Sequence, residues 1–388
     1  MTEITVPAGV VVAQTVVDYK GHAEVNKSTE QVAKSMGDTA NRAQQFAARA
    51  ASAAIIGLGA TTLAFVKAAQ ASMAFESSFA GIRKTVEATE EEFAQLKDQI
   101  FTLASVTPVT ADELNRIGEL GGQLGVAVQN LPDFIRTVSQ IAIATNLTVD
   151  NAALGLARLD AIAQTNGETF SNVSSTIVEL GNNFAATESE IMTTVLRIAQ
   201  AAAQVGATTQ DALAFATALQ AIGVPAQAGG TAVARVFQAI NSAIIQAGEE
   251  AEKFAQVAAS SVSQQSFEQL FGEDPAQATR LFIEGLAAIN EQGGDVVSIL
   301  DQLGLSQRRT MLAILGLAEA GDLLERTLIT GREAFEENTA ATEEALKRFS
   351  TLESQLQITR NIFNELGVQI GDDFLPVLKE ANQFVQEV

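Results

Sequence analysis

The sequence predicts an all-α protein, in which a central bundle of short helices is flanked by long helices that carry heptad repeats. Two observations predict this fold class. From about residue 26 onward, apolar residues recur at helical spacing, and several of these runs begin with a Thr followed three residues later by an acid. The apolar content, 47% of the residues, is chiefly Ala, Leu, Val and Ile, with no Trp and a single Tyr.

Residues 1–25 form a different kind of segment. Val and Ile are frequent between residues 4 and 19, and Pro7 and Gly9 stand near the front, which predicts a short extended N-terminal segment. No basic stretch precedes an apolar run here, so the sequence indicates no signal peptide.

Residues 26–89 are expected to form a long apolar helical segment. There are no charges between Arg49 and Lys67, and a seven-residue spacing of apolar and small residues then continues through the charged part that follows. Such a repeat is typical of a helix that packs along a continuous seam. The seam residues that we expect in this segment are Leu58, Phe65, Phe75, Phe79, Ile82 and Val86.

The uncharged part of this segment, residues 50–66, leaves a second interpretation open. Its length just reaches the lower limit for a membrane-spanning helix, but its Gly, Ser, Thr and Ala residues would make insertion marginal. The residues that would then contact the membrane are Ile55, Ile56, Leu58, Leu63, Phe65 and Val66.

Residues 90–340 predict a bundle of helices of 12 to 20 residues. Four pairs can cap helix starts, namely Thr89 with Glu92, Thr110 with Glu113, Thr187 with Glu190 and Thr208 with Asp211. Four prolines stand at or just before new helices, where a missing N–H costs nothing: Pro108, Pro132, Pro225 and Pro275. The polar window 248–265 predicts a loop or hinge.

Residues 341–388 return to long helix. Three heptads predict a second seam, made of Phe349, Leu352, Leu356, Phe363, Leu366 and Ile370. Gly367 and Gly371 are expected to end this helix, and Asp372 or Asp373 to cap a last one, which we expect to continue in a longer protein. We expect the two seams to associate between copies of the chain; cover by the bundle of the same chain is the alternative.

The residues that carry most enzyme chemistry are scarce. There is one histidine, His22, and there is no cysteine, so metal pairs of His and Cys and thiol nucleophiles are excluded. The sequence also lacks the Gly-Lys-Ser/Thr of a phosphate-binding loop. We therefore expect no catalytic residue, no metal site and no cofactor, and a protein that is not an enzyme. The net charge of −22 repels nucleic-acid phosphates, so specific nucleic-acid binding is not expected.

Four passages resemble, in the same order, the core region of phage tail tape measure proteins. They are MAFESSFAGIRKTV (73–86), TPVTADELNRIGELGGQLGV (107–126), AQVGATTQDALAFATALQAIGVPAQAGGTAVARVFQAI (203–240) and LESQLQITRNIFNELGVQIGDDFLPVLKEANQFV (352–385). The resemblance covers roughly residues 70–388, and the closing passage with its Leu-Pro-Val-Leu is the most characteristic.

The resemblance implies a structural virion protein. Helical copies lie in the lumen of the tail tube, set its length during assembly in the host cytoplasm, and leave ahead of the DNA at infection. It further implies a trimer or hexamer, and as partners the tail tube protein, tail assembly chaperones and the distal tail or baseplate hub proteins, with host membrane contact during ejection. A rival function, which the residues alone leave open, is a helical translocator or pore-former that inserts residues 50–66.

Overall fold

The computed structural model describes residues 58–165, 167, 169–246, 249–258 and 264–386, and for residues 58–67, 69, 264 and 370–386 it describes the backbone alone. These residues form seventeen α-helices and one 3₁₀ helix, and none of them is in a strand. The predicted all-α fold class is therefore confirmed. The extended segment expected at residues 1–25, which includes His22, lies outside the described residues.

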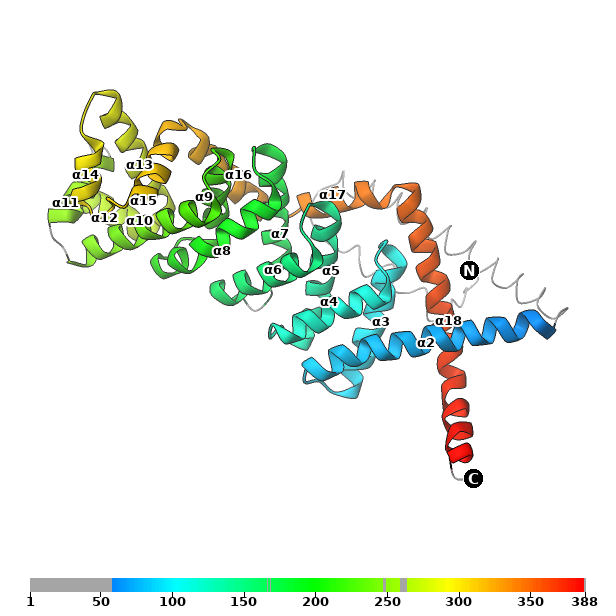
Figure 1. Ribbon diagram of the computed structural model, residues 1–388. Helices are drawn as coiled ribbons and strands as arrows, with labels where there is room; N and C mark the ends of the chain where they lie inside the picture. The colour runs from blue at the N-terminus through cyan, green and yellow to red at the C-terminus, as the bar shows by residue number, and fades with distance from the viewer. Residues whose placement is uncertain (1–57, 166, 168, 247–248, 259–263, 387–388) are drawn as a thin grey trace, which may run out of the picture. The chain divides into compact units, whose positions relative to one another are not determined.

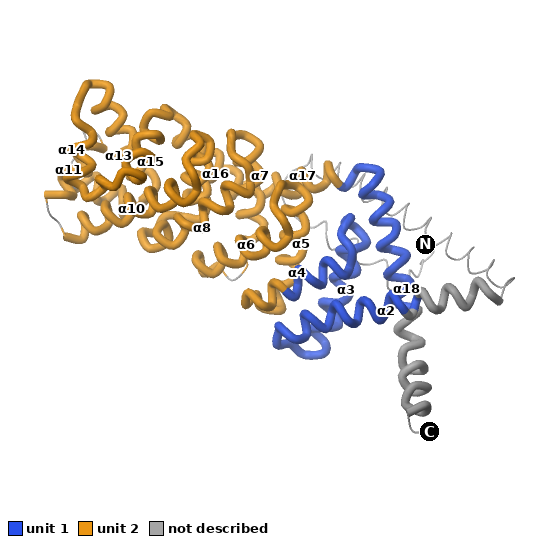
Figure 2. The backbone as a smooth tube through the Cα atoms, viewed as in Figure 1, with its two compact units in different colours: residues 1–119, 349–388 blue, residues 120–348 orange. Residues whose placement is uncertain are grey.

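The chain divides into two compact units, drawn in two colours in Figure 2. Unit 1 consists of residues 1–119 and 349–388, and unit 2 of residues 120–348. Unit 1 contains α2 (Leu58–Thr85), α3 (Glu90–Val106), most of α4 (Ala111–Gln123) and α18 (Leu352–Gln386). The two longest helices, α2 with 28 residues and α18 with 35, thus belong to the same unit.

Unit 1 is held together by α18, which packs against both α2 and α3. Two pairs of aromatic rings also join α2 to α3. The Phe75 ring stacks on Phe101 with 4.4 Å between the ring centroids, and the Phe79 ring meets the edge of Phe93 at 6.2 Å. Such pairs add directional contacts to the area that the rings bury, and they fix α2 on α3.

Unit 2 is a stack of shorter helices. They are η2 (Val128–Asn130), α5 (Leu131–Ala144), α6 (Val149–Ala163), α7 (Phe170–Asn183), α8 (Glu188–Val205), α9 (Thr209–Ala221), α10 (Ala226–Gln246), α11 (Glu249–Ala258), α12 (Gln264–Glu273), α13 (Pro275–Glu291), α14 (Val296–Gln302), α15 (Arg308–Glu319), α16 (Leu323–Glu337) and α17 (Ala340–Phe349). Helix α8 packs against α9 and α10, and α16 returns to pack against α7 and α9 (Figure 1). Six of the largest fully buried side chains of the protein are Phe residues of this unit: Phe134, Phe215, Phe237, Phe254, Phe267 and Phe282.

The predicted helix starts are confirmed. At α3 the Thr89 hydroxyl accepts a hydrogen bond from the Glu92 N–H at 3.2 Å, and the Glu92 carboxylate accepts one from the Thr89 N–H at 2.8 Å. The same reciprocal pair forms at Thr110–Glu113, Thr187–Glu190 and Thr208–Asp211. Each pair satisfies backbone donors that the first turn of a helix leaves without a partner.

The prolines also lie where the sequence places them. Pro132 and Pro275 are in the first turns of α5 and α13, and Pro225 directly precedes α10. The predicted range of helix lengths, 12 to 20 residues, is too narrow. The short helices run from the 7 residues of α14 to the 21 residues of α10.

The expected end of the long helix at Gly367 and Gly371 is wrong. Helix α18 continues through both glycines, so Asp372 and Asp373 lie inside it and cap no new helix. Gly367 lies against α2, where a methyl group at this position would be 3.6 Å from the Ala71 Cβ. A glycine in a helix costs about 1 kcal/mol relative to Ala, and the packing of two helices offsets that cost here.

The loop expected throughout residues 248–265 is wrong for most of that window. Residues Glu249–Ala258 form α11, which packs against α12 and α13. The polar composition of the window conceals one apolar face, because Ala251, Phe254 and Val257 are buried while the acids of the first turn favour the helix N-terminus. Residues 259–263, which include all three serines of the window, lie outside the described residues.

Candidate functional site

Three of the six residues of the predicted α18 seam lie on the exposed face of that helix. Leu352 is 76% exposed, Leu356 52% and Phe363 40%. The opposite face carries Ile358, Asn361 and Val368, which are buried. Of the other seam residues near α18, Phe349 is buried and Leu366 is half-buried, and only the backbone of Ile370 is described. The exposed apolar stripe is therefore formed by Leu352, Leu356 and Phe363.

The predicted seam of α2 lies in the core of unit 1. Phe75, Phe79 and Ile82 are buried, and Val86 is half-buried. Leu58 and Phe65 belong to the part of α2 for which the backbone alone is described. In this fold the three buried side chains are not available to another copy, whereas the α18 stripe is.

Asn361 joins α18 to the end of α3. The nitrogen of its side-chain amide lies within hydrogen-bond distance of three backbone carbonyl oxygens, those of Ala104 at 3.0 Å, Thr107 at 3.1 Å and Val109 at 2.8 Å, so one of its two N–H groups is shared between two of them. The last carbonyls of a helix have no partner inside the helix, and Asn361 supplies one. The sequence analysis did not predict this role. The pattern that could have indicated it is the spacing of Asn361, three residues after Ile358 and seven before Val368, which places all three on one face of the helix.

Glu365 lies on the same packed side of α18. Burial raises the pKa of its carboxyl above the usual value, and the nearby Asp98 carboxylate of α3 raises it further. Gln369 donates a hydrogen bond to the Glu365 Oε1 at 3.2 Å. The packing of α18 on α3 thus places the half-buried Glu365 carboxyl near the exposed Asp98 carboxylate.

A hollow of about 490 Å³ lies beside the exposed stripe of unit 1. It is lined by Leu352, Glu353, Leu356, Gln357 and Arg360, all of α18. Its lining thus combines two leucines with one charge of each sign.

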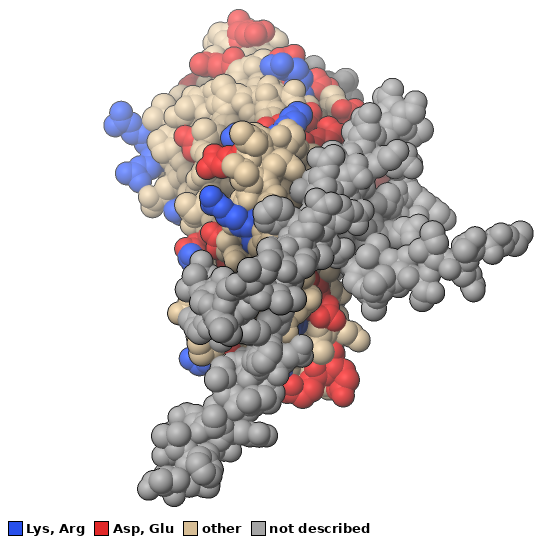
Figure 3. Space-filling model, turned by 90° about the vertical axis from the view of Figure 1, so that its right-hand side faces the viewer, with Lys and Arg blue, Asp and Glu red and all other residues tan. Residues whose placement is uncertain are grey.

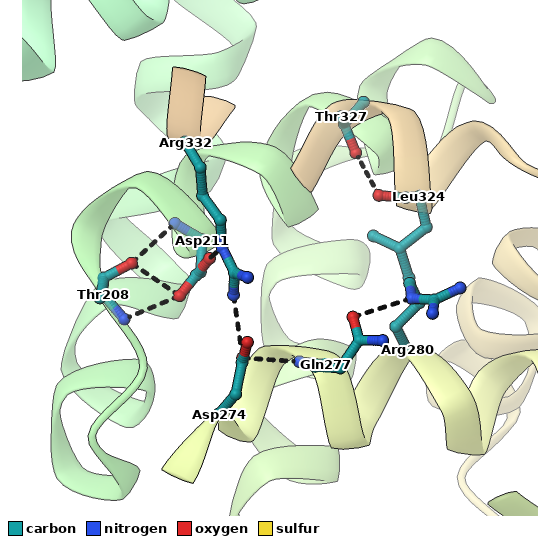
Figure 4. Close-up of polar contacts among 8 residues, drawn as sticks. All are labelled: Thr208, Asp211, Asp274, Gln277, Arg280, Leu324, Thr327 and Arg332. Carbon is teal, nitrogen blue, oxygen red and sulfur yellow. Dashed lines mark hydrogen bonds and ion pairs between the residues drawn. The ribbon is translucent and has the colours of Figure 1, made fainter. Parts of the chain in front are cut away.

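The most connected polar cluster of unit 2 centres on Arg332 of α16 (Figure 4). The Arg332 Nε donates to the Asp211 Oδ1 at 2.7 Å, and one terminal nitrogen of Arg332 donates to the Asp274 Oδ1 at 2.9 Å. Both carboxylates also cap helices: Asp211 accepts from Thr208 at the start of α9, and Asp274 accepts from the Gln277 N–H at the start of α13. One guanidinium therefore ties together the starts of two helices and a third helix.

The pKa values of Asp274 and Arg332 shift in the directions that favour their charged forms. Burial raises the pKa of Asp274, but the hydrogen bonds from Arg332 and from the Gln277 N–H together hold it below the usual value. For Arg332, burial lowers the pKa, and the two carboxylates more than reverse this and raise it. Both ions are therefore stable partners at neutral pH. The sequence predicted the Thr208–Asp211 cap, and it did not indicate Arg332.

A second hollow of unit 2, of about 380 Å³, is strongly acidic. Its lining includes Arg280 together with Glu284, Glu291, Glu319, Asp322 and Glu325. Arg280 forms an ion pair with Glu284 and lies 3.7 Å from Glu325. Because acids outnumber the single guanidinium, this hollow repels anions such as nucleic-acid phosphates.

Acidic and basic side chains are interspersed on the face drawn in Figure 3, and its described residues form no continuous basic stripe. Within the described ranges, no group of three or more His, Asp or Glu side chains is arranged to hold a metal ion. In the same part of the chain, every helix is too short or too polar to cross a membrane. Of the candidate membrane-contacting residues, Ile55 and Ile56 lie outside that part, and Leu63 and Val66 lie in α2 with only their backbone described.

Comparison with known proteins identifies the family. No curated protein and no solved structure is significantly similar to the chain. Residues 97–294 match the family model of the phage-related minor tail protein, a span that runs from α3 through α13 and includes Asp211 and Asp274. Because the match covers just over half of the 388 residues, the chain belongs to the phage-related minor tail protein family and is a structural protein of a phage tail.

Proposed function

We propose that this protein is a tail tape measure, which sets the length of the tail tube during assembly and is released ahead of the DNA at infection. The observation that carries the proposal is the order of the four tape-measure-like passages. Two of them, residues 73–86 and 352–385, lie outside the family match, in α2 and α18. These are the longest helices of the described chain, and long helices are what a molecular ruler requires.

In this role the protein occupies the lumen of the tail tube, after assembly in the host cytoplasm. Its partners are the tail tube protein, tail assembly chaperones and the distal tail or baseplate hub proteins, and it contacts the host membrane during ejection. A net charge of −22 supports the release step, because an acidic protein does not adhere to the DNA that follows it. The role needs no catalysis, so we further propose that the protein has no enzymatic activity.

Several copies, three or six, act together in this proposal. The number comes from the tape measure resemblance alone. Support for contact between copies is the exposure of Leu352, Leu356 and Phe363, since burying a side chain of this kind stabilises an assembly by about 1.5 to 3 kcal/mol.

Lengthening the protein tests the ruler. Two extra copies of residues 352–372 inserted in frame into α18, in the phage that encodes the protein, add six heptads and keep the phase of the heptad repeat. If the added residues are helical along the tube, the tail lengthens by about 60 Å, at 1.5 Å per residue. Electron microscopy of purified virions measures the tail length, and mass spectrometry verifies that they contain the lengthened chain.

The control is Gln369→Ala, which changes the same helix without changing its length. Its tails are expected to keep the parental length. Virions that contain the lengthened protein and still have tails of parental length would contradict the tape measure role, while the structural role in a phage tail would stand.

A further inference from the structure

Unit 1 presents an apolar stripe on α18 that the described residues of the unit leave uncovered. Leu352, Leu356 and Phe363 are exposed along it, and Thr359 stands between the last two. Their spacing is that of a heptad, with Leu356 and Phe363 at one seam position (a) and Leu352 and Thr359 at the other (d). The stripe spans roughly 16 Å, or three turns of helix.

Two charged residues border the stripe on one side. Glu353 and Arg360 each follow a d position directly, and both are exposed. They are seven residues apart, which is two turns, whereas ion pairs within a helix form between residues three or four apart. The two charges therefore stand ready for partners on another molecule, and both line the hollow beside the stripe.

The position of these charges selects the direction of a partner helix. In an antiparallel pair of heptad helices, a positions face d positions, and the residue after d faces its equivalent on the other helix. The register that sets Phe363 against Leu352 of a second copy also sets Leu356 against Thr359. The same register brings Glu353 beside Arg360 of the second copy, and twofold symmetry repeats the ion pair.

A parallel pair uses the charges differently. There the residue after d faces the residue five positions before it on the neighbouring helix. For Arg360 that residue is the uncharged Gln355, and for Glu353 it is Arg348, which belongs to α17 and not to α18. Within α18, therefore, neither Glu353 nor Arg360 gains an oppositely charged partner in the parallel arrangement.

We propose that a second copy of this chain covers the stripe, and that the two α18 helices pair antiparallel about a twofold axis, joined by Glu353–Arg360 ion pairs. This pairing goes beyond the tape measure role and belongs to the free protein, since copies that are coaxial in a tail tube run parallel. It shields the apolar stripe until assembly. Because the stripe is shorter than a standard interface, the dimer dissociates on dilution.

Charge exchange in the full-length chain tests the proposal. In Glu353→Arg two arginines meet at each symmetric site, and in Arg360→Glu two glutamates meet. Repulsion in place of attraction at both sites is expected to weaken dimerisation by about tenfold in each variant. The double variant Glu353→Arg with Arg360→Glu restores the ion pairs in reverse and is expected to dimerise like the wild type. Sedimentation velocity over a range of concentrations gives the dissociation constants.

Asn364→Lys is the matched control, because it changes the charge at an exposed position of the same helix outside the stripe. Its dimerisation is expected to match the wild type. A further variant, Leu356→Asp with Phe363→Asp, is expected to be monomeric with nearly unchanged helical content by circular dichroism.

Three results would overturn the proposal. They are a wild type that stays monomeric at high concentration, single charge variants that dimerise normally, and a double charge variant that fails to recover. Unfolding of the double Asp variant would show instead that the stripe belongs to the core. None of these results depends on tail length, so this test and that of the ruler can fail separately.

Discussion

Arg332 and Asp211 lie 121 residues apart in the sequence, and the Arg332 Nε donates a 2.7 Å hydrogen bond to the Asp211 carboxylate. The Asp211 side chain is 3% exposed and that of Arg332 is 39% exposed. A polar group with so little access to water is costly to bury unless it is hydrogen-bonded. The pair therefore makes the folding of α9 depend on α16.

Replacing Arg332 by Ala is expected to destabilise unit 2 by about 2 to 3 kcal/mol, because Asp211 would be left buried without its cation; the partial exposure of Arg332 keeps the loss below that of a fully buried pair. Chemical denaturation followed by circular dichroism measures the change. Lys347→Ala is the control, since Lys347 is 69% exposed in its pair with Glu344 and such pairs contribute under about 1 kcal/mol. Equal losses of stability in the two variants would show that the Arg332 cluster contributes no more than an exposed ion pair.

The same cluster predicts how stability depends on pH. The pKa of Asp274 is below its usual value in the fold, so the contribution of its ionised form is complete above the unfolded-state pKa and is lost as the pH falls through the folded-state pKa. Wild-type protein should therefore lose thermal stability below about pH 4. Asp274→Asn is expected to be less stable at pH 7 and to lose less on acidification. Melting curves between pH 7 and pH 3 test this, and parallel curves for the two proteins would contradict it.

The range of the contacts decides what could be predicted from the sequence. The Thr–acid caps join residues three apart, so the residues themselves predict them, and all four are present. Arg332 reaches partners 58 and 121 residues away, and nothing in its neighbourhood indicates this. Gly367 has a local preference that predicts a helix end, but the packing of α18 against α2 overrides it.

Helix α18 shows that apolar spacing alone does not identify which face of a helix is buried. It carries two heptad lines, and the more apolar one, with Leu356 and Phe363, was expected to be buried by another copy or by the bundle. The line that packs inside unit 1 contains Ile358 and Val368 together with Asn361, and polar residues weaken its apolar signal. Which line faces the core depends on the carbonyls at the end of α3, and these are known only from the fold.

Asn361 is the basis of a third prediction. Asn361→Ala removes the side-chain amide that reaches three backbone carbonyl oxygens at and just after the end of α3. The substitution is expected to destabilise unit 1 by about 1 to 3 kcal/mol. Asn364→Ala changes an exposed Asn of the same helix and should have little effect. Hydrogen exchange measured by mass spectrometry resolves the two units, and faster exchange in α3 and α18 is the expected signature. Equal protection in both variants would show that Asn361 does not cap α3.

Glu365 predicts a stabilising substitution. Its pKa is raised in the fold by burial and by Asp98. The ionised form therefore lowers the stability of the fold at neutral pH. This loss is recovered as the pH falls from the folded-state pKa to the lower pKa of the unfolded chain. Glu365→Gln removes the charge and is expected to raise the melting temperature of unit 1 at pH 7, with the gain disappearing on acidification through that window. Glu87→Gln, at an exposed position, serves as the control. A variant that is less stable than the wild type at pH 7 would contradict the assignment.

The last prediction concerns a close approach between α11 and α13 of unit 2. A methyl group at Gly285 of α13 would lie 1.6 Å from the Val257 carbonyl oxygen of α11, far inside van der Waals contact, and the obstacle is backbone that no side-chain rotation can move. Gly285→Ala is therefore expected to cost roughly 3 kcal/mol, although Ala is the better helix former by about 1 kcal/mol. Gly272→Ala is the matched control, because no atom lies within 4 Å of the added methyl group and the helix preference alone should act. Denaturation midpoints should move in opposite directions for the two variants. If Gly285→Ala is as stable as Gly272→Ala, helices α11 and α13 do not approach each other at Gly285.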